Sequence, residues 1–301
     1  MNAPGAFRKY HGLGNDYLIP LDPREATAET INPETVRKVC DPHYGLGSDG
    51  ILYGPYPPSS RFFGSLNQPQ AICAFRILNP DGSEAEKSGN GVRIFARYLF
   101  DCGAVELHKP FTLATLGGPV VCKIDDPDDA IQAQMGRVSF DSARIPVAGD
   151  RREVLDETLD LDTGDRVRFC AATVGNPHCV VLMGDALPTR ELAMRLGPVL
   201  ESHPLFPYRT NVQFLKALDE HTVQVEIYER GAGYTLASGT SSTACAAVAV
   251  RMGLCKSPVK VVMPGGALTI TLAEDFQATL IGPVERVYDA QLFLRGVSSE
   301  S

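Results

Sequence analysis

Residues 88–99 of the chain are SGNGVRIFARYL, and residues 238–249, placed 150 positions later, are SGTSSTACAAVA. In the first stretch, apolar residues recur at helical spacing from Val92 to Leu99, and Gly103 follows as a helix terminator. The second stretch opens with the same Ser-Gly pair before a run of small apolar residues. Each stretch therefore predicts a buried helix entered through a Ser-Gly turn.

A strand and a polar turn precede each of these helices. Residues 73–78 are typical of a strand and end in the turn cluster at 79–83. Residues 222–228 alternate between polar and apolar side chains, as a half-buried strand does, and the second helix is expected over 243–252. The two halves repeat one plan, which predicts a pseudo-repeat of two mixed α/β units.

Composition limits the classes of protein to which the chain can belong. Its 301 residues are 44% hydrophobic and 21% charged, which suits two soluble domains. A net charge of −8 argues against a nucleic-acid partner, because phosphate binding needs clustered Lys and Arg. No apolar stretch reaches about 18 residues and the start lacks an apolar signal region, so we expect no membrane association and a cytoplasmic location.

The eight cysteines form no CxxC pair, and we expect buried free thiols and no metal site. The sequence also lacks a nucleotide-binding loop. The Gly-Leu-Gly run at 12–14 has none of the remaining dinucleotide fingerprint.

Seven motifs in the right order resemble the diaminopimelate epimerase family over almost the whole chain. They are HGLGND at 11–16, NPDGSE at 79–84, GNGVR at 89–93, GNPHC at 175–179, GPVLESH at 197–203, NVQF at 211–214 and ERGAGYT at 229–235.

The resemblance implies an α+β fold of two pseudo-symmetric mixed α/β domains, each with a sheet wrapped around a central helix. We expect an N-terminal domain at 1–130, joined by the returning segment 284–301, and a C-terminal domain at 131–283. The implied activity is that of an amino-acid epimerase that needs no cofactor. A homodimer is also implied.

In the family, one cysteine thiolate removes the α-proton and a second thiol protonates the opposite face of the α-carbon. Here both positions carry hydroxyls, namely Ser88 and Ser238. A serine hydroxyl is a far weaker acid than a thiol and needs an activating base near neutral pH. Two serines alone therefore do not reproduce the thiolate–thiol pair.

Three interpretations of the serines stay open. They were introduced by mutagenesis, or they belong to a naturally divergent enzyme, or the protein binds its ligand without turnover. Ser241 stands where the family usually has Gly, and Gly50 where it usually has Gln, which favours natural divergence. The first function hypothesis is a cofactor-independent isomerase acting at the α-carbon of an amino acid. The alternatives are another proton-abstraction reaction, such as dehydration, elimination or double-bond isomerisation, and a catalytically silent amino-acid-binding protein.

The binding residues of the family are better preserved than its catalytic pair. The resemblance assigns the substrate pocket to Asn15, Asn79, Asn176, Asn211, Glu229 and Arg230, and the α-carboxylate cradle to Gly89, Asn90, Gly239 and Thr240. Arg230 can hold a distal carboxylate and Glu229 can accept from an ammonium group. We therefore expect a small amino-acid substrate, dicarboxylic in character.

Ser88, Ser238, His178 and Glu229 are the candidate catalytic residues. His178 suits an auxiliary proton carrier because the ordinary pKa of histidine lies near neutrality. The competing interpretation is a hydrogen-bonded histidine of the core.

Overall fold

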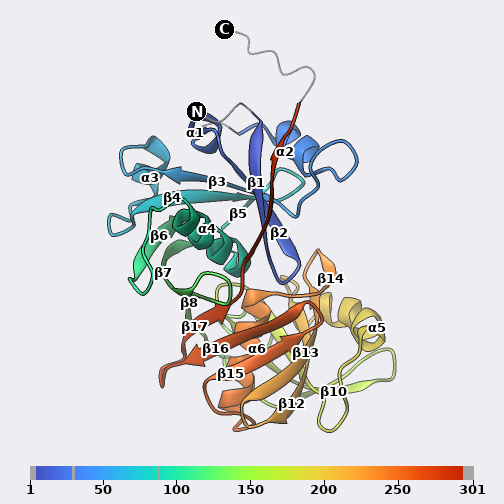
Figure 1. Cartoon of the computed structure of the whole chain (residues 1–301). Helices are drawn as coiled ribbons and strands as arrows, with labels where there is room; N and C mark the ends of the chain where they lie inside the picture. The colour runs from blue at the N-terminus through green and yellow to red at the C-terminus, as the bar shows by residue number, and fades with distance from the viewer. Residues whose placement is uncertain (1–4, 29–30, 87, 294–301) are drawn as a thin grey trace. The chain divides into compact units, whose positions relative to one another are not determined.

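The computed structural model describes residues 5–28, 31–86 and 88–293, and the chain divides into two compact units (Figure 1). Unit 1 comprises Met1–Ala133 and Pro283–Ser301, and unit 2 comprises Gln134–Gly282. The first change of unit falls inside strand β8 (Ala130–Arg137). The chain thus completes unit 2 before its last strand returns to unit 1.

Unit 1 is built on one mixed sheet in the order β18-β1-β2-β3-β4-β6-β7-β8, with β5 paired to the end of β4. Pairs β2–β3 and β4–β6 are parallel and the others antiparallel. The strands are β1 (Ala6–Gly12), β2 (Asn15–Pro20), β3 (Ile51–Tyr56), β4 (Cys73–Leu78), β5 (Glu84–Ala85), β6 (Phe111–Thr115), β7 (Gly118–Asp126) and β18 (Glu285–Gln291). The helices are α1 (Pro23–Ala26), α2 (Pro33–Cys40), α3 (Arg61–Leu66) and α4 (Gly89–Asp101).

Unit 2 has the sheet order β9-β10-β11-β12-β13-β15-β16-β17, with β14 paired to the end of β13. Its strands are β9 (Glu157–Asp160), β10 (Arg166–Thr173), β11 (Pro177–Leu182), β12 (Asn211–Asp219), β13 (Thr222–Glu229), β14 (Gly233–Thr235), β15 (Val259–Met263), β16 (Gly266–Leu272) and β17 (Gln277–Gly282). Its helices are α5 (Arg190–Glu201) and α6 (Gly239–Arg251).

The two units share one pairing scheme. Pairs β11–β12 and β13–β15 are the parallel pairs of unit 2, and they correspond to β2–β3 and β4–β6 of unit 1. Helices α4 and α6 follow the equivalent short strands β5 and β14. The predicted pseudo-repeat in an α+β fold is confirmed.

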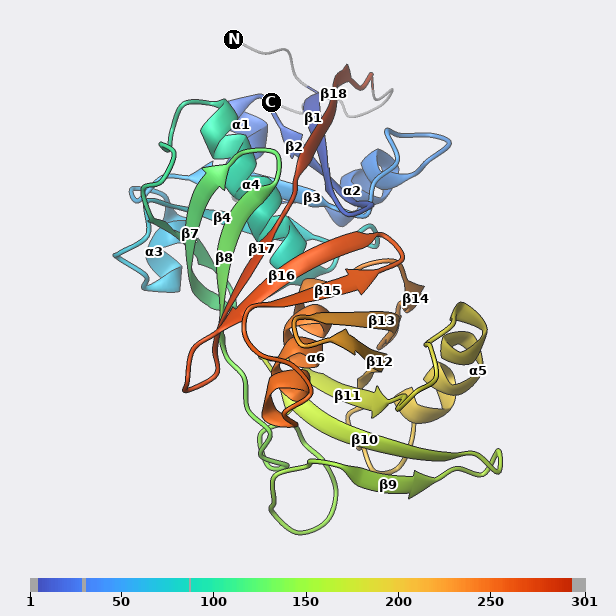
Figure 2. The same ribbon diagram turned by 60° about the horizontal axis from the view of Figure 1, so that its bottom comes forward.

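A central helix forms the core of each unit. On α4, Phe95 is fully buried and stacks on Phe75 of β4, with ring centroids 4.3 Å apart. Helix α6 contacts strands β10–β13 and β15–β17 (Figure 2). Its side chains are mostly small, which suits close packing against the sheet. Among the described residues, no helix is long and apolar enough to cross a membrane.

Helix α6 begins at Gly239, four residues before the predicted start at Thr243. Hydroxyl-rich segments ordinarily favour turns, because their side chains compete for backbone groups. Here the Ser242 and Thr243 hydroxyls instead donate to the carbonyls of Ser238 and Gly239, at 2.7 and 2.8 Å, within the first helical turn. Because this turn is buried, the backbone carbonyls satisfy these hydroxyls, and the helix starts early.

Truncating Phe95 should destabilise unit 1 strongly. Phe95→Ala removes a stacked, fully buried ring from α4 and should lower the free energy of unfolding by about 3–5 kcal/mol. Leu116→Ala, at a turn residue that is 45% exposed, is the control and should change it by at most about 0.5 kcal/mol. Urea unfolding followed by circular dichroism measures both, and equal effects would contradict a core centred on α4.

Candidate active site

Ser88 is the N-cap of α4 in unit 1. Its Oγ accepts a hydrogen bond from the Gly91 backbone N–H at 3.0 Å and lies 3.4 Å from the hydroxyl of Tyr17. A Cβ at position 91 would come within 3.2 Å of the Ser88 Cβ, so glycine lets the cap close tightly. The half-buried serine oxygen is thereby fixed at the start of a buried helix.

Asn15 and Asn90 meet beside this cap. Asn90 donates from Nδ2 to Asn15 Oδ1 at 3.2 Å and accepts at Oδ1 from Arg93 at 2.9 Å. Arg93 is fully buried, also donates to the Gly89 carbonyl, and has no carboxylate partner within the described part of the chain. Burial lowers the pKa of Arg93 to about 9, which leaves it charged at neutral pH. This charge adds to the partial positive charge of the helix N-terminus and favours an anionic ligand there.

Asn79 has a local role in the structure. Its side-chain amide donates to Ser83 Oγ at 2.9 Å, within the turn that follows β4. The contacts of Asn79 are those of a turn residue, and none joins it to Ser88 among the described residues. Its predicted place in the substrate pocket stays a prediction.

Ser238 is the N-cap of α6 in unit 2, and Glu229 lies beside it at the end of β13. The Ser238 Oγ accepts from the Ser241 N–H at 3.4 Å, and the serine is buried. Burial raises the pKa of the Glu229 carboxyl above its ordinary value, and its hydrogen bond with Ser238 partly offsets this rise. Unit 2 thus pairs a serine hydroxyl with a carboxylate that is a stronger base than an exposed glutamate.

Asn176, His178 and Thr240 form a second cluster in unit 2. The Asn176 side chain contacts His178 Nε2 at 2.9 Å through Oδ1 and donates to Thr240 Oγ1 at 3.4 Å. His178 is fully buried, and burial lowers its pKa to about 3. The imidazole is therefore neutral near pH 7, and its contacts orient Asn176 toward the first turn of α6.

Asn211 and Arg230 are joined through the backbone. Asn211 donates from Nδ2 to the Pro177 carbonyl at 2.9 Å and accepts at Oδ1 from the Arg230 N–H at 3.0 Å. The exposed Arg230 guanidinium donates to the Tyr208 carbonyl at 3.1 Å. Asn211 therefore fixes the backbone from which the Arg230 side chain extends, and that side chain keeps further donors for a ligand.

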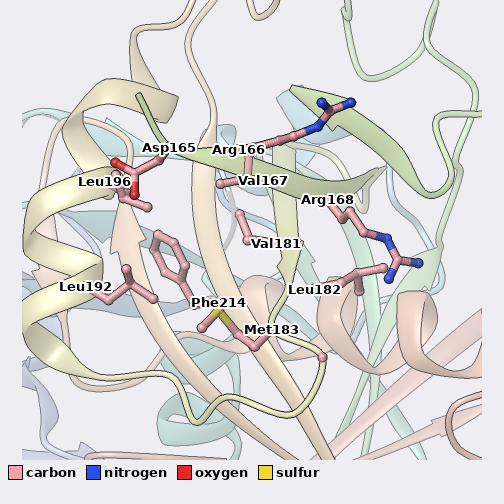
Figure 3. Close-up of a pocket in the computed structure, with 11 residues that line it drawn as sticks. Asp165, Arg166, Val167, Arg168, Val181, Leu182, Met183, Leu192, Leu196 and Phe214 are labelled. Carbon is pink, nitrogen blue, oxygen red and sulfur yellow. The ribbon is translucent and has the colours of Figure 1, made fainter. Parts of the chain in front are cut away.

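A cavity of about 360 Å³ in unit 2 lies apart from these clusters (Figure 3). Leu192 and Leu196 of α5 and Phe214 of β12 contribute its apolar wall. Asp165 at its edge is paired with Arg195. None of the predicted site residues lines this cavity.

Tyr17 lies next to the catalytic candidate Ser88, and the sequence alone did not single out this tyrosine. It follows directly after the HGLGND motif, but a single aromatic residue on a strand is typical of a core position. Its hydroxyl contact with Ser88 depends on how β2 packs against the start of α4, which no local pattern encodes.

The chain has two repeated units, each with a serine that caps its central helix, and comparison with known proteins shows which class has this arrangement. A family model described as "Diaminopimelate epimerase" matches residues 7–140 and 170–287. Diaminopimelate epimerase 2 of Nostoc sp. (strain PCC 7120) is 50% identical over 286 residues, covering 95% of each chain. The diaminopimelate epimerase of Desulfitobacterium hafniense is 37% identical and covers 94% of this chain and 96% of its own.

Likeness to a solved structure supports the same fold. A hydroxyproline epimerase from Agrobacterium vitis, solved with bound trans-4-hydroxy-L-proline, superposes with a TM-score of 0.64 at 17% identity. The match covers 95% of this chain and 90% of that chain. The chain belongs to the diaminopimelate epimerase family. It is accordingly an enzyme of the epimerase and racemase type.

Burial of His178 should make stability depend on pH. Its pKa is about 3 in the folded chain and about 6.5 when unfolded, so between these values only the unfolded chain binds the proton. The free energy of unfolding should therefore fall by about 2 kcal/mol from this residue between pH 7 and pH 5. Urea unfolding at both pH values should show that His178→Gln lacks this part of the pH dependence. An unchanged dependence in the variant would refute the neutral, buried imidazole.

Proposed function

We propose that this enzyme inverts the α-carbon of a small dicarboxylic amino acid, with Ser88 and Ser238 in place of the two thiols of the family. Diaminopimelate, which the relatives are named after, is the candidate substrate. The observation that carries the proposal is the place of Glu229 beside Ser238: burial raises the pKa of the Glu229 carboxyl, and the serine hydroxyl partly offsets this rise. Glu229 supplies the activating base that a serine lacks on its own.

In this mechanism the Ser238 oxygen takes the α-proton while its own proton passes to Glu229. The Cα–H bond breaks, a new O–H bond forms at Ser238, and the original serine proton ends on the carboxylate. Because these two transfers are concerted, no free alkoxide is formed at Ser238. In the same scheme the Ser88 O–H bond breaks as its proton forms the new Cα–H bond on the opposite face, and the Ser88 oxygen takes a replacement proton from its surroundings. The reverse reaction exchanges the roles.

The developing negative charge on the substrate needs positive partners. The backbone N–H groups of Gly89 and Asn90 open α4, and those of Gly239 and Thr240 open α6. Helix N-termini of this kind favour a carboxylate and stabilise it further as it gains enolate character. The buried Arg93 guanidinium strengthens the field at the start of α4.

In this proposal, polar groups of unit 2 hold the distal part of the substrate. Arg230 suits a second carboxylate because its planar guanidinium forms two parallel hydrogen bonds. The Asn176 amide, held by His178, suits a substrate amine or carboxylate. Under this proposal Asn211 acts through Arg230 by fixing its backbone.

The native enzyme should exchange the α-protons of LL- and meso-diaminopimelate for deuterium in D₂O. Proton NMR should show loss of the α-proton signals and interconversion of the two isomers. Ser88→Ala and Ser238→Ala should abolish the exchange. Ser60→Ala, which removes the N-cap of α3 outside the predicted site, should leave it unchanged. Binding of both isomers without exchange by the native enzyme would overturn the proposal and leave a silent binding protein or an elimination with another substrate.

Glu229→Gln should slow this exchange by about 10²–10⁴-fold, because it removes the proton acceptor of Ser238. Glu226→Gln is the matched control. Glu226 is a buried carboxylate on the same strand, and its partner is the Tyr234 hydroxyl at 2.6 Å. Exchange rates at saturating substrate compare the two variants. An equal loss in both would indicate damage to β13 rather than loss of a base.

A further inference from the structure

Tyr17 is a buried residue of β2, only 6% exposed, whose hydroxyl reaches Ser88. The two oxygen atoms are 3.4 Å apart, a long contact of the kind that tightens when a substrate binds. Ser88 Oγ already accepts from the Gly91 N–H. The serine oxygen therefore has the phenol oxygen as a second neighbour, and either hydroxyl can donate to the other.

Gly50 makes room for the Tyr17 ring. A Cβ at position 50 would lie 2.8 and 3.1 Å from the ring carbons Cε1 and Cδ1, and 2.4 Å from the Leu78 carbonyl oxygen. The φ angle of Gly50 lies outside the left-handed region, so space and not backbone conformation requires the glycine. The absence of a side chain at position 50 therefore allows the observed position of the Tyr17 ring.

The pseudo-repeat gives Tyr17 a counterpart in unit 2. Tyr17 lies two residues after Asn15 on β2, and His178 lies two residues after Asn176 on the equivalent strand β11. His178 contacts its asparagine, whereas Tyr17 contacts the serine. Ser238 has its partner in a carboxylate instead. The two serines thus occupy equivalent positions in the two units but neighbour different proton-transfer groups, a phenol and a carboxyl.

We propose that Tyr17 sets the protonation of the Ser88 oxygen and relays its proton, a role that rests on the proposed epimerase function. When the Ser88 O–H bond breaks and its proton forms a Cα–H bond, the Tyr17 O–H bond breaks and a new O–H bond forms at Ser88. The charge stays as a phenolate, which takes a proton from water or, in the reverse reaction, from Ser88. A phenol, with an ordinary pKa of about 10, holds that charge far better than a serine oxygen.

A thiol introduced by Ser88→Cys provides a measurement that needs no substrate. A hydroxyl that donates to a thiolate lowers its pKa and raises its reactivity at neutral pH. Adding Tyr17→Phe should therefore slow alkylation of the introduced thiol by iodoacetamide at pH 7 by about tenfold, the value of one hydrogen bond to a charged group. Adding Tyr56→Phe, which removes a buried hydroxyl bonded to the Ala28 carbonyl, should leave the rate unchanged.

Peptide mass spectrometry separates the introduced thiol from the eight native ones, of which only Cys102 is exposed. Gly50→Ala in the Ser88→Cys chain offers a second test, because it displaces the ring while keeping the hydroxyl. It should slow alkylation in the same direction as Tyr17→Phe. Identical pH–rate profiles with tyrosine and phenylalanine at position 17 would overturn the proposal, whatever the enzyme does to its substrate.

Tyr17→Phe in the otherwise native chain then tests the relay during the reaction. The α-proton exchange rate should fall about 10²-fold for the isomer whose proton is taken by Ser88, with KM changed less than about twofold. Glu229→Gln should act chiefly on the opposite isomer. An equal loss for both isomers with a raised KM would assign Tyr17 to packing alone and overturn the relay. Absence of exchange in the native enzyme would refute the proposed function, and the alkylation rates would still decide the Tyr17–Ser88 coupling.

Discussion

The N-cap hydrogen bond of a serine at the start of a buried helix, made once in each unit, is the constraint on which the rest depends. A helix buried as deeply as α4 or α6 needs partners for its first N–H groups, and the serine oxygens supply them at Gly91 and Ser241. The same bonds fix the oxygens that the proposed chemistry uses. The serine oxygen that caps each helix is therefore also the atom that the proposed reaction uses. The sheet around each helix holds that oxygen in place.

The two units share one fold but place different chemical groups beside their serines. The strand order and the parallel pairs are the same in both units, yet Ser88 neighbours a phenol and Ser238 neighbours a carboxylate. A phenol favours the protonated serine, while a carboxylate favours removal of the serine proton. An inversion needs one acid and one base at each moment, so two differently poised hydroxyls suit it better than two identical ones.

The sequence was sufficient for the fold, because apolar spacing and Ser-Gly turns are local signals that repeat in both halves. It also named Ser88, Ser238 and Glu229 as catalytic candidates, and their roles stay predictions. It did not show that His178 is buried and neutral, since burial depends on packing against distant strands and outweighs the ordinary pKa of the side chain. The sequence did not indicate a role for Tyr17 either, because its partner Ser88 is 71 positions away in the chain.

Hydroxyls in place of thiols should change the sensitivity of the site to oxidation as well as the rate of proton transfer. A thiolate held ready for proton transfer is also a target for oxidation, whereas serine does not enter that chemistry. The native thiols of this chain are poorly suited to replace it, because burial raises the pKa of Cys170, Cys245 and Cys255 and keeps them protonated. Under the proposed relay through Glu229 and Tyr17, Ser88 and Ser238 stay neutral at rest and use the acid or base only when substrate is present. Such a site loses the intrinsic speed of sulfur and gains resistance to oxidation.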